Sequence, residues 1–122
     1  MLTDSLFHII SSDHQENVIN AVLEMDTTNE IFEGHFPGQP VLPGACMVQL
    51  IKEVLEKNLS TTLKLEKADN LKFMSLIDPQ KNNLLLLEIN YTIDERQVKA
   101  AASLIAEDVI CFKFQGIFIK KN

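Results

Sequence analysis

Hydrophobic residues recur at two different spacings along this chain, and each spacing predicts a different kind of element. Between Phe7 and Met25, apolar residues partly alternate with polar ones on either side of the polar cluster 11–17. This pattern predicts a hairpin or two successive strands. Within it we expect His14 to be a solvent-exposed turn residue and His8 to have a structural role in the first strand.

From residue 44 to residue 58, by contrast, apolar residues return every three or four positions, which predicts a helix buried along one side. Pro43 suits the first turn, where a missing N–H costs nothing, and Asn58 is the expected terminator. The expected buried residues are Met47, Leu50, Ile51, Val54 and Leu55. The expected solvent-facing residues are Lys52, Glu53, Glu56 and Lys57.

Beyond this helix the pattern again indicates strands. The run 83–87 also fits a helix, but the β-branched and aromatic residues that follow it favour a strand. We expect strands over residues 63–77, 83–93 and 97–121, with turns at 78–83, 93–96 and Glu107–Asp108. One helix followed by several antiparallel strands predicts an α+β fold in which the sheet closes over the helix.

Length and composition place these elements in one domain covering residues 1–122. The first fifteen residues lack a basic leader, and no apolar run approaches the roughly 18–20 residues that span a bilayer. We therefore expect a soluble, cytoplasmic protein without a membrane span. Cys46 and Cys111 lie among apolar neighbours without CxxC spacing, which favours reduced core thiols over a disulfide or a metal site.

Charge narrows the range of partners. Seventeen acidic residues against eleven scattered basic ones give a net charge of −6, which argues against nucleic acid as a partner. The same charge disfavours an acidic protein partner unless a local basic patch compensates, and the sequence alone does not locate such a patch.

The segment from Gly34 to Gly44, GHFPGQPVLPG, is the most informative part of the chain. Its three prolines and three glycines predict an ordered loop that leads directly into the helix. This loop resembles the HFPG-x-P-x-x-PG signature of the bacterial 3-hydroxyacyl-[acyl carrier protein] dehydratases, which precedes the central helix of a hot-dog domain. The order of the surrounding elements also fits, so the resemblance covers the whole chain and implies a hot-dog fold.

Dehydration of a 3-hydroxyacyl thioester needs a base for the α-proton, an acid for the departing hydroxyl, and donors for charge on the carbonyl oxygen. The resemblance implies that His35 transfers protons, a role that suits imidazole near neutral pH. The amides of Gly44 and Ala45, at the helix start, are candidate donors to the thioester. Gly44 would also let the substrate approach the backbone. We place Phe36, Pro43, Phe73 and Met74 along the acyl tunnel, although apolar strand residues such as the last two are usually core.

One position departs from the resembling family, whose acidic partner stands where this chain has Gln49. An amide has no proton to lose near neutral pH, so Gln49 is neither a general acid nor a general base. In one alternative, Gln49 holds a water or the substrate hydroxyl while His35 transfers both protons. Alternatively, Glu53 supplies the carboxylate from one turn further, or the chain has lost dehydration and binds acyl groups as a partner subunit. A solvated helix face also accounts for Gln49.

Three functions therefore remain open: a dehydratase, a non-catalytic acyl-binding or partner subunit, and a hot-dog thioesterase, against which the motif argues. The expected partner is an acyl carrier protein or a CoA thioester, and no metal or redox cofactor is required. The resemblance also implies a homodimer or an assembly of dimers. A lone domain would leave a sheet edge and the loop residues Phe32 and Phe36 exposed.

Overall fold

The computed structural model describes residues 5–32 and 42–121. Its elements run in the order β1 (Phe7–Gln15), β2 (Val18–Met25), η1 (Glu30–Phe32), α2 (Gly44–Leu59), β3 (Leu63–Phe73), β4 (Leu84–Asp94), β5 (Gln97–Ala106) and β6 (Val109–Lys120). The strands form one sheet in the order β1-β2-β4-β5-β6-β3, and all its pairings are antiparallel.

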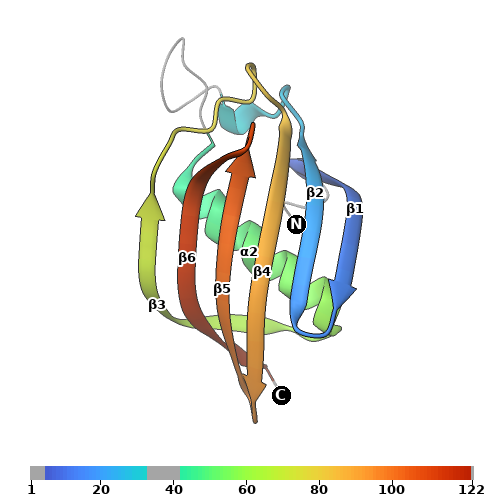
Figure 1. Cartoon of the computed structure of the whole chain (residues 1–122), viewed down its shortest axis with the longest axis vertical. Coiled ribbons are helices and arrows are strands. Elements are labelled where there is room, and N and C mark those ends of the chain that lie inside the picture. The colour runs from blue at the N-terminus through green and yellow to red at the C-terminus, as the bar shows by residue number, and fades with distance from the viewer. Residues whose placement is uncertain (1–4, 33–41, 122) are drawn as a thin grey trace.

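The sheet curves around α2, which crosses its concave face (Figure 1). This is the α+β hot-dog arrangement expected from the sequence. The strand that follows the helix does not pair with its neighbours in sequence, because β3 lies at the far edge beside the last strand, β6. Two register shifts, at Leu65/Lys67 and Ala68/Asn70, interrupt this pairing as bulges in β3.

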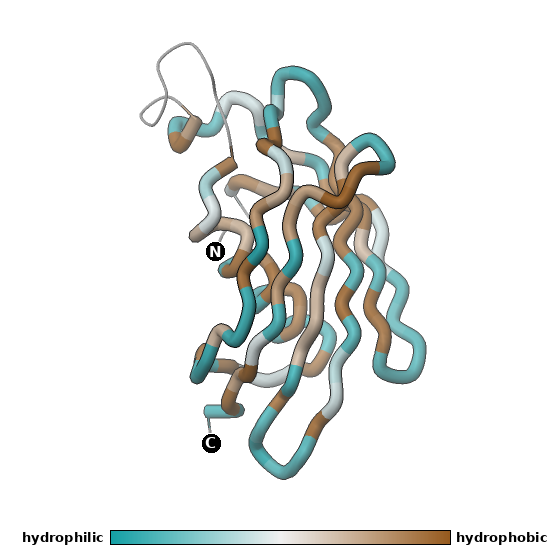
Figure 2. Tube along the Cα trace, turned by 60° about the vertical axis from the view of Figure 1, so that its left-hand side comes forward, coloured by the Kyte–Doolittle hydropathy of each residue, from teal (hydrophilic) through white to brown (hydrophobic). Residues whose placement is uncertain are grey.

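The core lies between the concave face and the helix. On β4, buried Leu85, Leu87 and Ile89 alternate with side chains that face outward, as expected for a strand with one wet face. Figure 2 shows that hydrophobic and hydrophilic residues alternate along the strands, and that the hairpin turns are hydrophilic. On β6, Phe112, Phe114 and Phe118 are at most 1% exposed, which confirms that this apolar segment packs into the core.

Both ends of α2 have identifiable causes. The helix begins at Gly44, after Pro43 in an extended conformation. The expected end at Asn58 is wrong: the helix runs to Leu59, and Ser60 adopts a left-handed conformation with φ of 52° whose N–H donates to the Glu56 carbonyl. The Asn58 side-chain amide instead donates to the Val54 carbonyl, 2.8 Å away.

The first hairpin also differs from the prediction. Strand β1 continues through most of the polar cluster to Gln15, and the turn is confined to Glu16, with φ of 54°, and Asn17. His14 is therefore a strand residue, which corrects its expected place in a turn. Its Nε2 lies 2.6 Å from the hydroxyl of Tyr91 on β4, so the imidazole and the phenol form a hydrogen bond across the sheet. Polar side chains concealed this extension of the strand, because residues 11–15 are all exposed and none of them is apolar.

The strand expected over residues 63–77 ends earlier, at Phe73, but the turn expected at Glu107–Asp108 is confirmed. Glu107 and Asp108 both have positive φ and connect β5 to β6, and the run 84–87 belongs to strand β4 rather than to a helix. Phe32, expected to be exposed, is buried within η1 at 6% exposure. Phe36 lies outside the described residues.

Strand β3, like the other edge strand β1, buries much less than the inner strands do. It forms one edge of the described sheet, and its end and the segment after it leave large apolar side chains exposed. These are Leu71 (43% exposed), Phe73 (59%), Met74 (51%) and Leu76 (76%).

Candidate active site

The start of α2 is the first component of the site. The carbonyl of Pro43 accepts hydrogen bonds from the amides of Cys46 and Met47, at 3.1 and 3.4 Å, so the bonded part of the helix begins beyond Ala45. The first amides of a helix have no acceptor within it and attract negative charge. Gly44 is partly buried and Ala45 is exposed.

An aromatic ring lies directly over this helix start. A Cβ added to Gly44 would stand 2.6 Å from Cε1 and 2.7 Å from Cζ of Phe73, so any larger residue there requires the ring to move. The ring also packs against Phe112, with 4.8 Å between the centroids. The structure thus brings together two predicted site residues that are far apart in sequence. A thioester that reaches the Gly44 backbone has to share or take the space of this half-exposed ring.

Backbone hydrogen bonds join the segment after β3 to the residue before the helix start and to β6. The amide of Leu42 donates to the Ile77 carbonyl at 2.9 Å, and the amides of Met74 and Ser75 both donate to the Cys111 carbonyl. These bonds hold partly buried Pro43 and the exposed Met74 near the end of the sheet where the helix begins. The predicted site residues His35 and Phe36 lie outside the described residues, so their positions stay predictions.

The helix carries a polar pair on one flank. Nε2 of Gln49 donates a hydrogen bond to Oε2 of Glu53, with 2.8 Å between the two atoms. Glu53 is 1% exposed and is the one buried charged side chain among the described residues, so its expected place on the solvent-facing side is wrong. The spacing contained the signal for this flank. Residues 46, 49 and 53 are three and four positions apart, which places Gln49 and Glu53 on the side of buried Cys46.

The two cysteines are not activated. Burial raises the pKa of the Cys46 thiol. Burial also raises the pKa of Cys111, against the opposing effect of a hydrogen bond with the Ala106 backbone. Both thiols are free and buried, which fits the expected core role. Within residues 5–32 and 42–121, no three His, Cys, Asp or Glu side chains lie close enough together to hold a metal ion.

The outer face of the sheet has a basic feature that the sequence did not locate. Lys72 on β3 and Lys113 on β6 are direct cross-strand partners, and Ser103 on β5 pairs with Lys113. These three residues line a hollow of about 350 Å³, together with Asn70, Asn90, Ala101, Ala102, Phe114 and Gln115. Like charges directly opposite each other destabilise a sheet. The lysine pair is therefore a candidate for a role outside folding.

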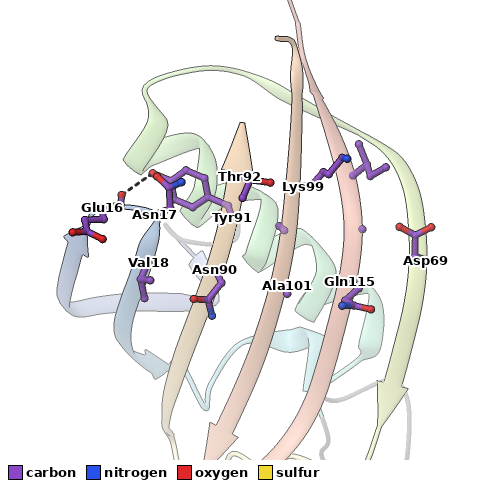
Figure 3. A pocket seen from close by; sticks show the side chains of 13 residues that line it. Glu16, Asn17, Val18, Asp69, Asn90, Tyr91, Thr92, Lys99, Ala101 and Gln115 are labelled. Carbon is purple, nitrogen blue, oxygen red and sulfur yellow. Dashed lines mark hydrogen bonds between the residues drawn. The ribbon is translucent and has the colours of Figure 1, made fainter. Parts of the chain in front are cut away.

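A larger hollow of about 880 Å³ lies next to it on the same face. Figure 3 shows Asn90, Ala101 and Gln115 on neighbouring strands there, with Lys99 and Asp69 near its margin. Asp69 forms an exposed ion pair with Lys67, 3.2 Å apart, so this hollow has mixed charge.

This fold, a curved antiparallel sheet around one long helix, defines a hot-dog-fold protein. The family model described as ApeI dehydratase, ApeI-like, matches residues 11–113. The chain therefore belongs to the ApeI-like dehydratase family. No helix within the described part of the chain is long and apolar enough to cross a membrane.

Individual relatives agree with this assignment. A 3-hydroxyacyl-[acyl-carrier-protein] dehydratase FabZ from Alkaliphilus metalliredigens is 32% identical over 95 residues, which cover 70% of this chain and 63% of that protein. The matched segment thus spans less than two thirds of that relative. The FabZ of Fusobacterium nucleatum is 22% identical over 117 residues, 91% of this chain and 82% of the relative.

Solved structures support the fold. The dehydratase heterocomplex ApeI:P from Xenorhabdus doucetiae matches with a TM-score of 0.75 at 23% identity, covering 91% of this chain and 96% of that one. A putative thioesterase from Lactococcus lactis, yhdA, matches with a TM-score of 0.69 at 8% identity, covering 98% and 95%. Both likenesses concern the fold alone.

Proposed function

We propose that this protein dehydrates 3-hydroxyacyl thioesters, forming 2-enoyl thioesters and water. The observation that carries the proposal is the helix start, where the half-exposed ring of Phe73 lies against Gly44, the first residue of α2. Membership of a dehydratase family and the GHFPGQPVLPG loop that ends at this point support the same reaction.

The chemistry follows from this placement. The thioester carbonyl accepts from the amides of Gly44 and Ala45, which stabilise the negative charge that develops as the α-proton leaves. His35 takes that proton, in the role that the loop motif implies. The bond between the β-carbon and the hydroxyl oxygen then breaks and a carbon–carbon double bond forms. The departing hydroxyl takes up one proton and leaves as water, which balances the α-proton that His35 removes. Pro43, Phe73 and Met74 border the path of the acyl chain in this proposal.

The proposed partner is an acyl carrier protein. The chain's net charge of −6 opposes an acidic partner, but the pair Lys72 and Lys113 concentrates positive charge on the outer face of β3 and β6. Lys72 immediately precedes Phe73, and successive strand residues point to opposite faces. The basic pair is thus one residue away from the ring over the helix start. Two neighbouring cations suit an acidic surface or the phosphate of a pantetheine arm.

We also propose that a second copy of the chain pairs along β3. The exposed side chains of Leu71 and Phe73 and the unpaired edge of that strand support this arrangement. The second copy would close the acyl tunnel from the side that a single chain leaves open.

The test offers purified protein a 3-hydroxyacyl thioester on carrier protein and on CoA, and follows the 2-enoyl product. We expect turnover, and we expect His35→Ala to lose it by about a hundredfold or more. Free thiol is measured in parallel, because its release without enoyl product would indicate a thioesterase. Turnover that is absent, with His35→Ala indistinguishable from wild type, overturns the proposal.

A second candidate function is a non-catalytic acyl-binding subunit, which Gln49 in place of an acid favours. It predicts thioester binding without turnover, and a gain of turnover in Gln49→Glu. Wild-type turnover that Gln49→Glu does not improve excludes it.

A further inference from the structure

The buried carboxylate of Glu53 has no assigned role in the mechanism above. A carboxylate is costly to bury, because it gives up its hydration and must be compensated by hydrogen bonds or charges. At 1% exposure, Glu53 is nevertheless the one charged side chain buried among residues 5–32 and 42–121. Ionisable groups that a protein buries at such cost cluster at functional sites.

The carboxylate of Glu53 lies close to the side chain of Gln49, the position where the resembling family has its acid. Glu53 is one helical turn beyond Gln49, a displacement of about 6 Å along the axis, which is too far for simple replacement of an acid at residue 49. Side chains on a helix lean toward its N-terminus, however. Accordingly, Oε2 of Glu53 lies 2.8 Å from Nε2 of Gln49. The carboxylate therefore reaches the level of the Gln49 amide, on the flank nearer the helix start.

We infer that Glu53 is the acid of the dehydration and that Gln49 is a positioning residue that holds its carboxyl group in place. This inference rests on the proposed function. The Glu53 carboxyl gives its proton to the departing hydroxyl, which leaves as water, while His35 takes the α-proton. Return of that proton from imidazolium to carboxylate through solvent restores both groups, so no other reactant is consumed.

The roles of the two side chains follow from their chemistry. The Gln49 amide donates through Nε2, and this bond restricts the rotation of a long side chain whose free movement would weaken proton transfer. An amide at residue 49 and a carboxylate at residue 53 thus together supply what a single acid at residue 49 would.

The experiment compares Glu53→Gln with a matched change on the same helix, Glu56→Gln. Glu56 accepts a 2.8 Å hydrogen bond from the Leu63 amide, and a glutamine oxygen can still accept it. We expect Glu53→Gln to lower kcat by about 10²- to 10⁴-fold with an unchanged or higher Tm, because it removes a buried charge and keeps the side-chain shape. Glu56→Gln should leave kcat unchanged.

The double variant Gln49→Glu/Glu53→Gln, called the exchanged pair, swaps the two side chains and keeps one amide and one carboxylate in contact. It keeps the test informative if the single variant Glu53→Gln does not fold. We expect it to recover at least tenfold of the lost kcat. For Gln49→Ala we expect a lower kcat at unchanged KM, since that variant keeps the acid and loses its orientation. Equal turnover of wild type and Glu53→Gln, or an exchanged pair that folds without recovering kcat, overturns the role of Glu53. Absence of wild-type turnover overturns the proposed function itself, and this role with it.

Discussion

The middle of the sheet and its β3 edge share one alternating pattern but bury it to different extents. On β4, inward-facing Leu85, Leu87 and Ile89 are at most 2% exposed. On β3, Leu71 and Phe73 remain 43% and 59% exposed. Yet these two residues pair in register with Phe114 and Phe112, which are buried in the core. Alternation therefore identifies the inner side of a strand, and position in the sheet decides whether this side serves stability or remains available for binding.

The largest effect that separates the two regions should be on stability. Phe114→Ala removes a ring that is 1% exposed, and we expect it to lower the free energy of unfolding by about 3–5 kcal/mol. Phe73→Ala removes a ring that is mostly in solvent and should cost about 1 kcal/mol or less, while it changes turnover or chain-length preference. Urea unfolding of both variants measures this difference. Equal losses of stability would contradict the distinction.

An intermediate effect is expected from placing the same methyl group in each region. Gly44→Ala meets the movable ring of Phe73, so we expect stability within about 1 kcal/mol of wild type but kcat/KM lower by roughly ten- to a hundredfold. Gly116→Ala meets the Lys67 backbone oxygen and the Phe114 ring, each 2.6 Å away, in the packed sheet. That variant should lose about 1–3 kcal/mol of stability. Thermal unfolding and steady-state kinetics measure both variants. A larger loss of stability in Gly44→Ala, or a larger loss of kcat/KM in Gly116→Ala, would contradict the comparison.

The smallest effect concerns the outer side of the same edge. Lys113→Glu places an opposite charge across from Lys72, and we expect it to stabilise the chain by about 0.2–1 kcal/mol at low salt. The same variant should lower kcat/KM for a carrier-borne substrate severalfold and leave a small soluble thioester unaffected. Lys81→Glu, in an exposed turn, is the control for net charge. If both variants affect the carrier-borne substrate equally, the basic pair is not a docking point.

Much of the fold could be predicted because hydrophobic spacing reports local structure directly. The helix beginning at Gly44, the strands around Ile89 and Phe114, and the turn at Glu107–Asp108 all lie where spacing and turn residues placed them. The place of β3 at the far edge could not be predicted, since strand order depends on contacts between distant segments. The extension of β1 through His14 was missed for a different reason, because exposed polar strands carry little periodic signal.

The site was less predictable than the fold. The motif directed attention to Gly44, and the structure added the ring of Phe73 above it, a contact between residues 29 positions apart. A glutamate on a helix is usually solvent-facing, so residue type alone predicts the wrong side for Glu53, which is buried. The pairing of Lys72 with Lys113 needs the register of two strands, which a single sequence does not supply.

The two bulges in β3 have a consequence for how copies of this protein meet. A regular unpaired strand edge with apolar side chains would accept one strand after another and so promote fibre growth. Each bulge adds a residue that has no counterpart, which bends the strand and divides its hydrogen-bonding groups into short regular stretches. We therefore expect association along this edge to need a partner of matching curvature, which favours the proposed closed pair over an open-ended stack.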